Sequence, residues 1–285
     1  MLTDKEITEI LIEYIKEKRY TNAILIDGDW GTGKTFFIKK ILLKELKKNV
    51  GKKDRCLYVS LYGIEDVVQI SSKIYAEILV NSVTNFFEDK IKKTFIYTGI
   101  KLATKLSSTF ESWKGIRLPS LKDIINIKNC IIIFDDIERA NMDINKILGY
   151  VNDLVEHNEV KAILVANEKE IVENEKYIKI KEKLIGKTIK YAPKLSIVYK
   201  NILECYIKNN IQLMEYLNKE EQKKLILNDF TENNHFNLRT LVYSLVIYQK
   251  FFEILKEIDF DLKYIEKHKS RILKYTIYLS IQMKL

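Results

Sequence analysis

The stretch Gly28-Asp29-Trp30-Gly31-Thr32-Gly33-Lys34-Thr35 decides the fold class of this chain. It matches the pattern GxxxxGK[ST] at every fixed position. The apolar run Ala23–Asp27 precedes it and predicts a short buried strand, and Lys34–Lys48 follows it with helical periodicity. Glycines permit backbone conformations with positive φ, so the successive N–H groups of such a loop can point at an anion. The strand, loop and helix therefore predict a phosphate-binding loop.

Positions within this loop carry different expected roles. The Lys34 ammonium is expected to reach the β- and γ-phosphates of a nucleotide, and the Thr35 hydroxyl to ligate Mg²⁺. The N-terminus of the following helix would face the phosphates. The expected nucleotide-binding residues are Gly28, Asp29, Trp30, Gly31, Thr32, Gly33, Lys34, Thr35 and Phe36. The expected cofactors are therefore ATP and Mg²⁺.

A second apolar run ends in acids. Residues Cys130–Phe134 are apolar and rich in β-branched side chains, as expected for a strand buried on both faces, and they lead into Asp135-Asp136-Ile137-Glu138-Arg139. An apolar strand that ends in an acid downstream of a phosphate loop is the Walker B arrangement. We expect Asp135 to hold the Mg²⁺ shell and Asp136 to orient and deprotonate the attacking water, with Glu138 as the alternative base. The competing interpretation is that these acids form the first turn of the next helix, where the helix dipole favours them.

Two further polar residues are candidates for contacting the phosphates. Asn167 follows the apolar run Val160–Ala166, where an amide could bridge the γ-phosphate and the attacking water; alternatively it caps the following helix. Arg239 opens an apolar helix and could fold back over bound phosphates, or it is an ordinary arginine at a helix N-terminus. The role of Arg139 is open. The basic residues interpreted as part of a solvated face are Lys181, Lys183 and Lys187.

Composition and periodicity define the fold class and its division. The chain has 285 residues but only nine glycines and two prolines, too few turn residues for a β-sandwich or barrel. Strands that alternate with helices predict a parallel α/β sheet flanked by helices. We expect a P-loop NTPase core over residues 1–192, with a helical insertion at about 86–121, and an all-helical C-terminal lid domain of four or five helices over 193–285. The expected strands are Ala23–Asp27, Cys56–Leu61, Cys130–Phe134, Val160–Ala166 and Lys187–Tyr191.

Bulk properties disfavour several classes of function. The net charge is +9, but acids and bases interleave along the chain, so a dedicated nucleic-acid surface is not favoured. The three cysteines form no CxxC pair and the three histidines stand apart from them, so neither a disulfide framework nor a metal cluster is expected. No run is apolar enough to span a membrane, and the N-terminus lacks the pattern of a signal peptide. These features predict a cytoplasmic protein.

Taken together, the segments GDWGTGKTFF, IIIFDDIER, ILVANE and NLR resemble the KAP family of P-loop NTPases, within the additional-strand ATPases related to AAA+ and STAND proteins. The resemblance covers roughly residues 20–245, and its most specific parts are Trp30 inside the loop and the FDDIER element. It implies that Lys34 and Thr35 bind ATP·Mg²⁺ and that Asp135 and Asp136 serve metal and water. It also implies that Asn167 and Arg239 are the first and second sensors.

The resemblance further implies an ATP-hydrolysing molecular switch or motor. Many KAP proteins carry membrane-spanning helices between the two Walker elements; the segment 86–121 lies at that place but is too polar to span. Bacterial relatives are often linked with antiphage defence. The alternatives are a non-hydrolysing ATP-dependent scaffold or sensor and a nucleic-acid-stimulated ATPase. The expected partners are further copies of the chain, or a protein that covers the apolar face of the last helix, formed by Tyr275, Tyr278, Leu279 and Met283.

Overall fold

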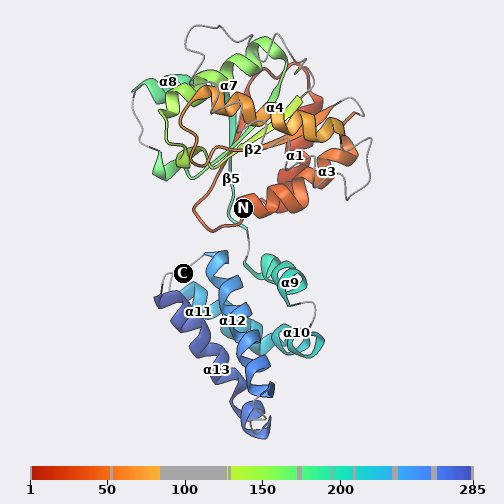
Figure 1. Cartoon of the computed structure of the whole chain (residues 1–285), viewed down its shortest axis with the longest axis vertical. Coiled ribbons are helices and arrows are strands. Elements are labelled where there is room, and N and C mark those ends of the chain that lie inside the picture. The colour runs from red at the N-terminus through yellow and green to blue at the C-terminus, as the bar shows by residue number, and fades with distance from the viewer. Residues whose placement is uncertain are drawn as a thin grey trace. The chain divides into compact units, whose positions relative to one another are not determined.

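The computed structural model describes residues 2–51, 54–83, 127, 130–171, 175–193, 195–207, 210–232, 237–257 and 262–283. The insertion expected at about 86–121 lies outside the described residues. The chain divides into two compact units (Figure 1). The α/β unit comprises residues 2–29 and 34–191, and the helical unit comprises residues 192–285 together with loop residues 30–33.

The α/β unit is built on a five-stranded sheet in the order β2-β3-β4-β1-β5, and all four strand pairings are parallel. This confirms the expected fold class. Each expected strand is present with its ends shifted by at most two residues. The strands are β1 (Ala23–Asp27), β2 (Arg55–Ser60), β3 (Cys130–Asp135), β4 (Lys161–Ala166) and β5 (Ile185–Lys190).

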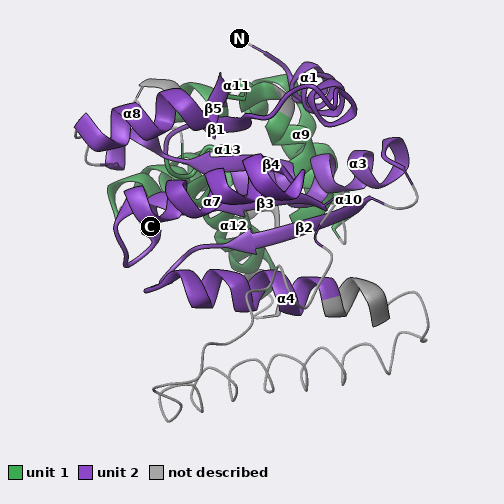
Figure 2. Ribbon diagram, turned by 90° about the horizontal axis from the view of Figure 1, so that it is seen from above, with its two compact units in different colours: residues 1, 30–33, 192–285 green, residues 2–29, 34–191 purple. Residues whose placement is uncertain are grey.

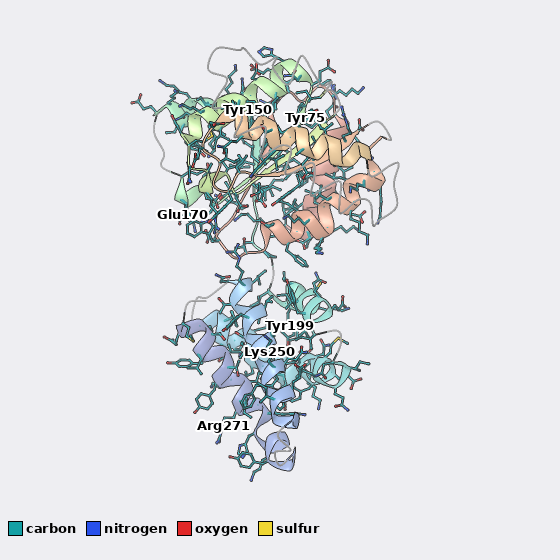
Figure 3. All side chains as sticks on the ribbon, viewed as in Figure 1. Tyr75, Tyr150, Glu170, Tyr199, Lys250 and Arg271 are labelled. Atoms are coloured by element: carbon teal, nitrogen blue, oxygen red, sulfur yellow. The ribbon has the colours of Figure 1, made fainter. Side chains whose placement is uncertain are left out.

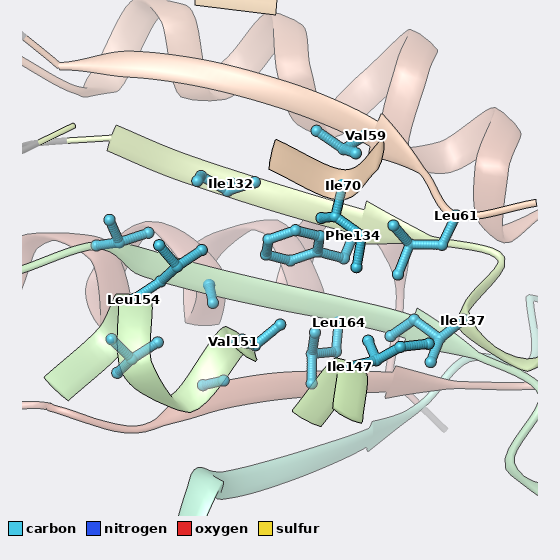
Figure 4. Close-up of a cluster of buried hydrophobic side chains, with 14 of the residues drawn as sticks. Val59, Leu61, Ile70, Ile132, Phe134, Ile137, Ile147, Val151, Leu154 and Leu164 are labelled. Carbon is cyan, nitrogen blue, oxygen red and sulfur yellow. The ribbon is translucent and has the colours of Figure 1, made fainter. Parts of the chain in front are cut away.

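Helices cover both faces of the sheet, as Figure 2 shows for this unit in purple. On one face, Ile131 and Ile133 of β3 join a buried cluster with the N-terminal helix and the helical segments after the phosphate loop. On the other face, Ile132 and Phe134 join a cluster with α4 and α7 (Figure 4). Successive side chains of a strand point to opposite faces, so a strand buried on both faces is apolar throughout. The helical elements are α1 (Asp4–Lys16), α2 (Lys34–Phe36), η1 (Phe37–Leu42), α3 (Leu43–Asn49), α4 (Val67–Val83), η2 (Ile137–Arg139), α7 (Ile144–Asn158), η3 (Glu168–Glu170) and α8 (Glu175–Leu184).

The helix after the phosphate loop is not regular along its length. One α-helical turn, α2, passes into η1, whose six residues Phe37–Leu42 form wider π-helical turns, before α3 resumes the α-helical geometry. Such turns occur often at functional sites. Phe37, Ile38 and Leu42 of this segment are fully buried against the sheet. The packing therefore fixes the helix that follows the loop.

The described part of the helical unit contains five helices around its own apolar core. Tyr199 is buried there, and its hydroxyl donates a 2.9 Å hydrogen bond to the Leu217 carbonyl (Figure 3). Four apolar side chains near the end of the last helix are 50–65% exposed: Tyr275, Tyr278, Leu279 and Met283. The helices are α9 (Leu195–Tyr206), α10 (Ile211–Asn218), α11 (Glu220–Glu232), α12 (Leu238–Glu257) and α13 (Leu262–Gln282). Among the described residues, no helix has the combination of length and apolarity that a membrane crossing requires.

Candidate nucleotide-binding site

The expected site residues of the α/β unit gather at the carboxyl edge of the sheet. β1 ends at Asp27, directly before the loop, β3 ends at Asp135, and Asn167 follows the last residue of β4. β4 lies between β3 and β1 in the sheet. In a parallel sheet all carboxyl ends meet at one edge, where ligands of this fold class bind.

The loop has the backbone that its glycines allow. Gly31 and Gly33 have φ values of +78° and +92°, a region that residues with a Cβ rarely adopt. The Gly28 N–H donates a 3.1 Å hydrogen bond to the Ala166 carbonyl, which ties the start of the loop to β4. The Trp30 side chain is 45% exposed.

Lys34 is almost completely buried at the base of the loop. Its ammonium donates to the carbonyls of Gly28 and Asp29, the second at 3.0 Å. Burial lowers the pKa of Lys34, and nearby acids partly offset the effect, with Glu138 contributing most. The ammonium is therefore held against the loop backbone, where it can meet a phosphate. Asp29 also pairs with Lys169 in the turn after β4, at 2.8 Å.

Thr35 and Asp135 meet directly. The Thr35 hydroxyl donates a 2.8 Å hydrogen bond to Asp135 Oδ2, and the Asp136 N–H donates to Asp135 Oδ1 at 2.9 Å. Asp135 is only 2% exposed. Burial raises the pKa of Asp135; the Tyr58 hydrogen bond opposes this, and the Asp136 charge adds to it. The Thr35 hydroxyl and the Asp135 carboxylate lie side by side and supply the hard oxygen donors that Mg²⁺ prefers, so this pair fits the metal.

The two candidate bases have different surroundings. Asp136 has a left-handed backbone, with φ of 58°. Its Oδ2 accepts a 2.9 Å hydrogen bond from the Ser60 hydroxyl, and Arg139 Nε lies 4.0 Å from its Oδ1. Glu138 lies in the short helix η2, and its charge acts on Lys34. Of these acids only Asp135 belongs to β3, while Asp136 precedes the short helical turn η2 and Glu138 lies in it. The next α-helix, α7, begins only at residue 144.

Asn167 is a buried amide beside the loop. It is 4% exposed, and its Oδ1 has no hydrogen-bond partner among the described residues. Its side chain makes no capping hydrogen bond to η3, the helical turn that follows. An unpaired buried amide oxygen costs free energy and is rare in native proteins, so the position requires another explanation than capping.

Arg239 belongs to the helical unit, in the first turn of α12, and is exposed. Its N–H donates a 3.0 Å hydrogen bond to the Asn237 side chain. Within the same unit, the Leu238 N–H donates to the Gly31 carbonyl at 2.8 Å. The start of α12 therefore lies against the loop residues that group with this unit. The cations interpreted as solvated differ in their contacts: Lys181 pairs with Glu168, and Lys183 with Glu156.

Sequence reasoning did not identify three side chains of this site. Tyr58 of β2 donates to Asp135 at 2.7 Å, and Ser60 of the same strand donates to Asp136. Burial and the adjacent acids raise the pKa of Tyr58, so its phenol remains a donor. Asp27, 4% exposed, accepts from the Glu168 N–H at 2.8 Å and from the Lys190 ammonium. Their part in the site depends on strand order, which no local pattern encodes.

Comparison with known proteins places the fold and the family. No characterised protein matches the chain at the level of sequence. Among solved structures, the ORC2 protein of Aeropyrum pernix in its ADP form is similar with a TM-score of 0.55 and 13% identity, over 95% of this chain and 66% of that one. AMPPCP-bound DnaA from Aquifex aeolicus matches with a TM-score of 0.40 and 16% identity, over 93% of this chain and 64% of that one. The chain thus spans about two thirds of the length of these proteins.

The likeness to ORC2, at 13% identity, shows the fold alone. The family assignment comes from a separate comparison, with family models. The model of the KAP family P-loop domain matches residues 5–252, which include the loop, both acidic positions at the end of β3, Asn167 and Arg239. The chain belongs to the KAP family of P-loop NTPases.

Proposed function

We propose that this protein binds ATP together with Mg²⁺ at the carboxyl edge of the sheet and hydrolyses it, acting as a nucleotide-dependent switch or motor. The observation that carries the proposal is the convergence of Lys34, Thr35 and Asp135. A buried ammonium lies in a glycine loop, and the Thr35 hydroxyl is hydrogen bonded to the Asp135 carboxylate. These are the groups that phosphoryl transfer needs for positioning and for charge stabilisation.

Each residue has a distinct part in this proposal. The N–H groups of the loop bind the phosphates, and Lys34 contacts the β- and γ-phosphates. Thr35 and Asp135 hold Mg²⁺, which when bound neutralises the charge that develops on the phosphates. Asp136 accepts the proton of the attacking water, and its partial exposure leaves it open to that water.

Asn167 supplies the remaining polar contact of the proposal. Its unpaired Oδ1 can accept a hydrogen bond from the attacking water. The amide therefore orients the water while Asp136 takes its proton. Arg239 is proposed as the second sensor on the family resemblance alone.

The test compares wild type with two variants and a control. Lys34→Ala should weaken binding of the ATP analogue AMPPNP by about 10–100-fold, because it removes a charge-assisted hydrogen bond. Asp136→Asn should keep AMPPNP binding and lose Mg²⁺-dependent phosphate release. Lys40→Ala, which removes an exposed lysine of the same helix, should match wild type. Calorimetry and a phosphate-release assay measure both properties.

The outcomes separate the proposal from its alternatives. Wild-type protein that fails to bind AMPPNP refutes the proposal. Tight binding with no phosphate release, alone or in an assembled particle, supports a non-hydrolysing scaffold instead. Phosphate release that requires DNA or RNA and falls steeply with added salt supports a nucleic-acid-stimulated ATPase.

We extend the proposal to antiphage defence on the family resemblance alone. Bacteria that express the wild-type chain should then plate phage less efficiently than bacteria that express Lys34→Ala. Equal plating across a panel of phages, with both proteins at equal abundance, would remove this part of the proposal and leave the biochemical part standing.

A further inference from the structure

Tyr58 contacts the Asp135 carboxylate from outside both nucleotide-binding motifs. Its hydroxyl donates a 2.7 Å hydrogen bond to Asp135 Oδ2, the same oxygen that accepts from the Thr35 hydroxyl at 2.8 Å. The Asp136 N–H donates to the other oxygen, Oδ1, at 2.9 Å. Donors from β2, from α2 and from the end of β3 therefore fix one carboxylate.

The strand geometry explains how Tyr58 reaches this position. β2 pairs with β3 in parallel register, with Tyr58 opposite Ile133 and Ser60 opposite Asp135. Leu57 and Val59 are buried on one face of the sheet, so the alternation turns Tyr58 and Ser60 to the other face. That face carries the helical segments that follow the phosphate loop. A tyrosine two residues before the end of β2 is long enough to reach the last residue of β3 along this face.

The ring of Tyr58 is itself held in place. Lys39 of η1 places its ammonium 4.3 Å from the centre of the Tyr58 ring, a favourable cation–π contact. Tyr58 also packs against the buried cluster on this face of the sheet. The hydroxyl is therefore presented from a fixed ring, with little freedom to leave the carboxylate.

The donors divide unequally between the two carboxylate oxygens. Oδ2 accepts two hydroxyl hydrogens, from Tyr58 and Thr35, which use both of its lone pairs. Oδ1 accepts one hydrogen within the described part of the chain, from Asp136 N–H. Oδ1 therefore keeps a lone pair for a cation or for water bound to one. Tyr58 contributes to this division, because without it Oδ2 has an unused lone pair and the carboxylate can rotate.

We propose that Tyr58 is a positioning residue for metal binding, because it holds the Asp135 carboxylate in the orientation that presents Oδ1 to Mg²⁺. The proposal rests on the function proposed above. Tyr58 touches neither nucleotide nor metal in this scheme and acts through Asp135. Hydrogen-bond partners that orient metal ligands typically change metal affinity by about 10–100-fold when they are removed.

The test uses Tyr58→Phe, which removes one oxygen atom and keeps the ring and its contact with Lys39. The matched control is Tyr150→Phe: Tyr150 lies on α7, labelled in Figure 3, and its hydroxyl is 2.9 Å from Ser71 Oγ. Both variants lose one hydrogen-bonded hydroxyl, but only Tyr58 contacts the site. The affinity for AMPPNP is measured by calorimetry in EDTA and at a series of free Mg²⁺ concentrations, and melting curves in EDTA show that each variant is folded.

Tyr58→Phe should raise the Mg²⁺ concentration that gives half of the gain in AMPPNP affinity by about tenfold. Its affinity in EDTA should stay within about twofold of wild type, and Tyr150→Phe should match wild type in both. An unchanged Mg²⁺ requirement in Tyr58→Phe overturns the proposal, and so does an equal loss of affinity in EDTA, which marks a general structural role. Wild-type protein that fails to bind AMPPNP refutes instead the proposed function on which this inference rests.

Discussion

Thr35 and Asp135 lie 100 residues apart in the sequence, and the Thr35 hydroxyl donates a 2.8 Å hydrogen bond to the Asp135 carboxylate. The bond joins the end of the phosphate loop to the end of β3. Asp135 is 2% exposed, and both oxygens of its carboxylate accept hydrogen bonds. The structure thus buries an acid at this edge of the sheet, although burial of a charge costs free energy.

The first prediction is that Asp135→Asn stabilises the protein while it removes metal binding. Burial raises the pKa of Asp135, so its charged form is disfavoured in the folded state. Above the raised pKa the folded protein carries the ionised carboxylate and with it this penalty, and relief of about 1 kcal/mol raises the melting temperature by about 2–4 °C. The penalty disappears as the pH falls through the raised pKa and then the unfolded value of about 3.9.

Melting curves between pH 4 and pH 8 in EDTA check this prediction. The difference between Asp135→Asn and wild type should be largest at neutral pH and shrink toward pH 4. The control is Asp66→Asn, at an exposed acid whose Oδ1 accepts a hydrogen bond from the Gln69 N–H at the start of α4; asparagine keeps this acceptor, so the variant should melt close to wild type at neutral pH. A lower melting temperature for Asp135→Asn at pH 7 would contradict the account.

The second prediction separates the two candidate bases. Asp136→Asn should lower turnover by about 10²–10⁴-fold, the range for loss of a general base. Glu138→Gln should lower it by less than about tenfold, because the proposal gives the proton of the attacking water to Asp136 and leaves Glu138 as one of the acids that raise the pKa of Lys34. Single-turnover phosphate release at saturating ATP measures both. The reverse order of effects would assign the base to Glu138.

Local patterns predicted the parts of the site that are continuous in the chain. The loop is a strand, a glycine pattern and a helix in succession, and the acids directly follow an apolar strand. Both depend on neighbours in sequence, which periodicity can show. Local patterns did not identify Tyr58 and Asp27 as site residues, because their hydrogen-bond partners, Asp135 and Lys190, come from other strands. The order β2-β3-β4-β1-β5 that unites them is set by tertiary packing.

Local patterns also fail to predict where a helix ends when the residue that ends it comes from a distant part of the chain. The helical spacing of the apolar residues between Ile7 and Ile15 predicts a first helix over Thr3–Tyr20, but α1 ends at Lys16. Glu17 instead forms an ion pair with Arg19, and the Lys161 ammonium donates to the carbonyls of Glu17 and Tyr20. A lysine 144 residues away from Glu17 thus binds a carbonyl that a longer helix would use. The amphipathic pattern of the segment contains no sign of that partner.

The third prediction concerns Asn167. Asn167→Ala should lower turnover by about 10–100-fold with little change in AMPPNP affinity, because the amide orients water rather than binding nucleotide. The melting temperature should not fall, because alanine removes a buried oxygen that lacks a partner. The control is Asn145→Ala on α7, at a second buried amide whose Oδ1 also lacks a partner among the described residues. Unchanged turnover in Asn167→Ala would exclude the role assigned to its amide.

The last prediction concerns Asp27 and Lys190, which join the ends of β1 and β5. Burial favours a raised pKa for Asp27, but hydrogen bonds from Lys190 and the Glu168 N–H outweigh it and lower the pKa. A lowered pKa means that the ionised carboxylate stabilises the fold above the unfolded value of about 3.9, and that this stability is lost as the pH falls through the folded value. Lys190→Met removes the ammonium, so the buried Asp27 carboxylate keeps the hydrogen bond from the Glu168 N–H and loses the one from Lys190.

Lys190→Met should therefore destabilise the protein at neutral pH by about 1–2 kcal/mol, measured by urea unfolding. This is less than the 3–5 kcal/mol typical of a fully buried pair, because the Lys190 side chain is 73% exposed and solvent screens it. Lys187→Met, at an exposed lysine of the same strand, should change stability by less than about 0.5 kcal/mol. The difference in stability between the two variants should narrow as the pH falls through the lowered pKa of Asp27. Equal stability of both variants at pH 7 would show that the Lys190 ammonium does not stabilise the ionised Asp27 carboxylate.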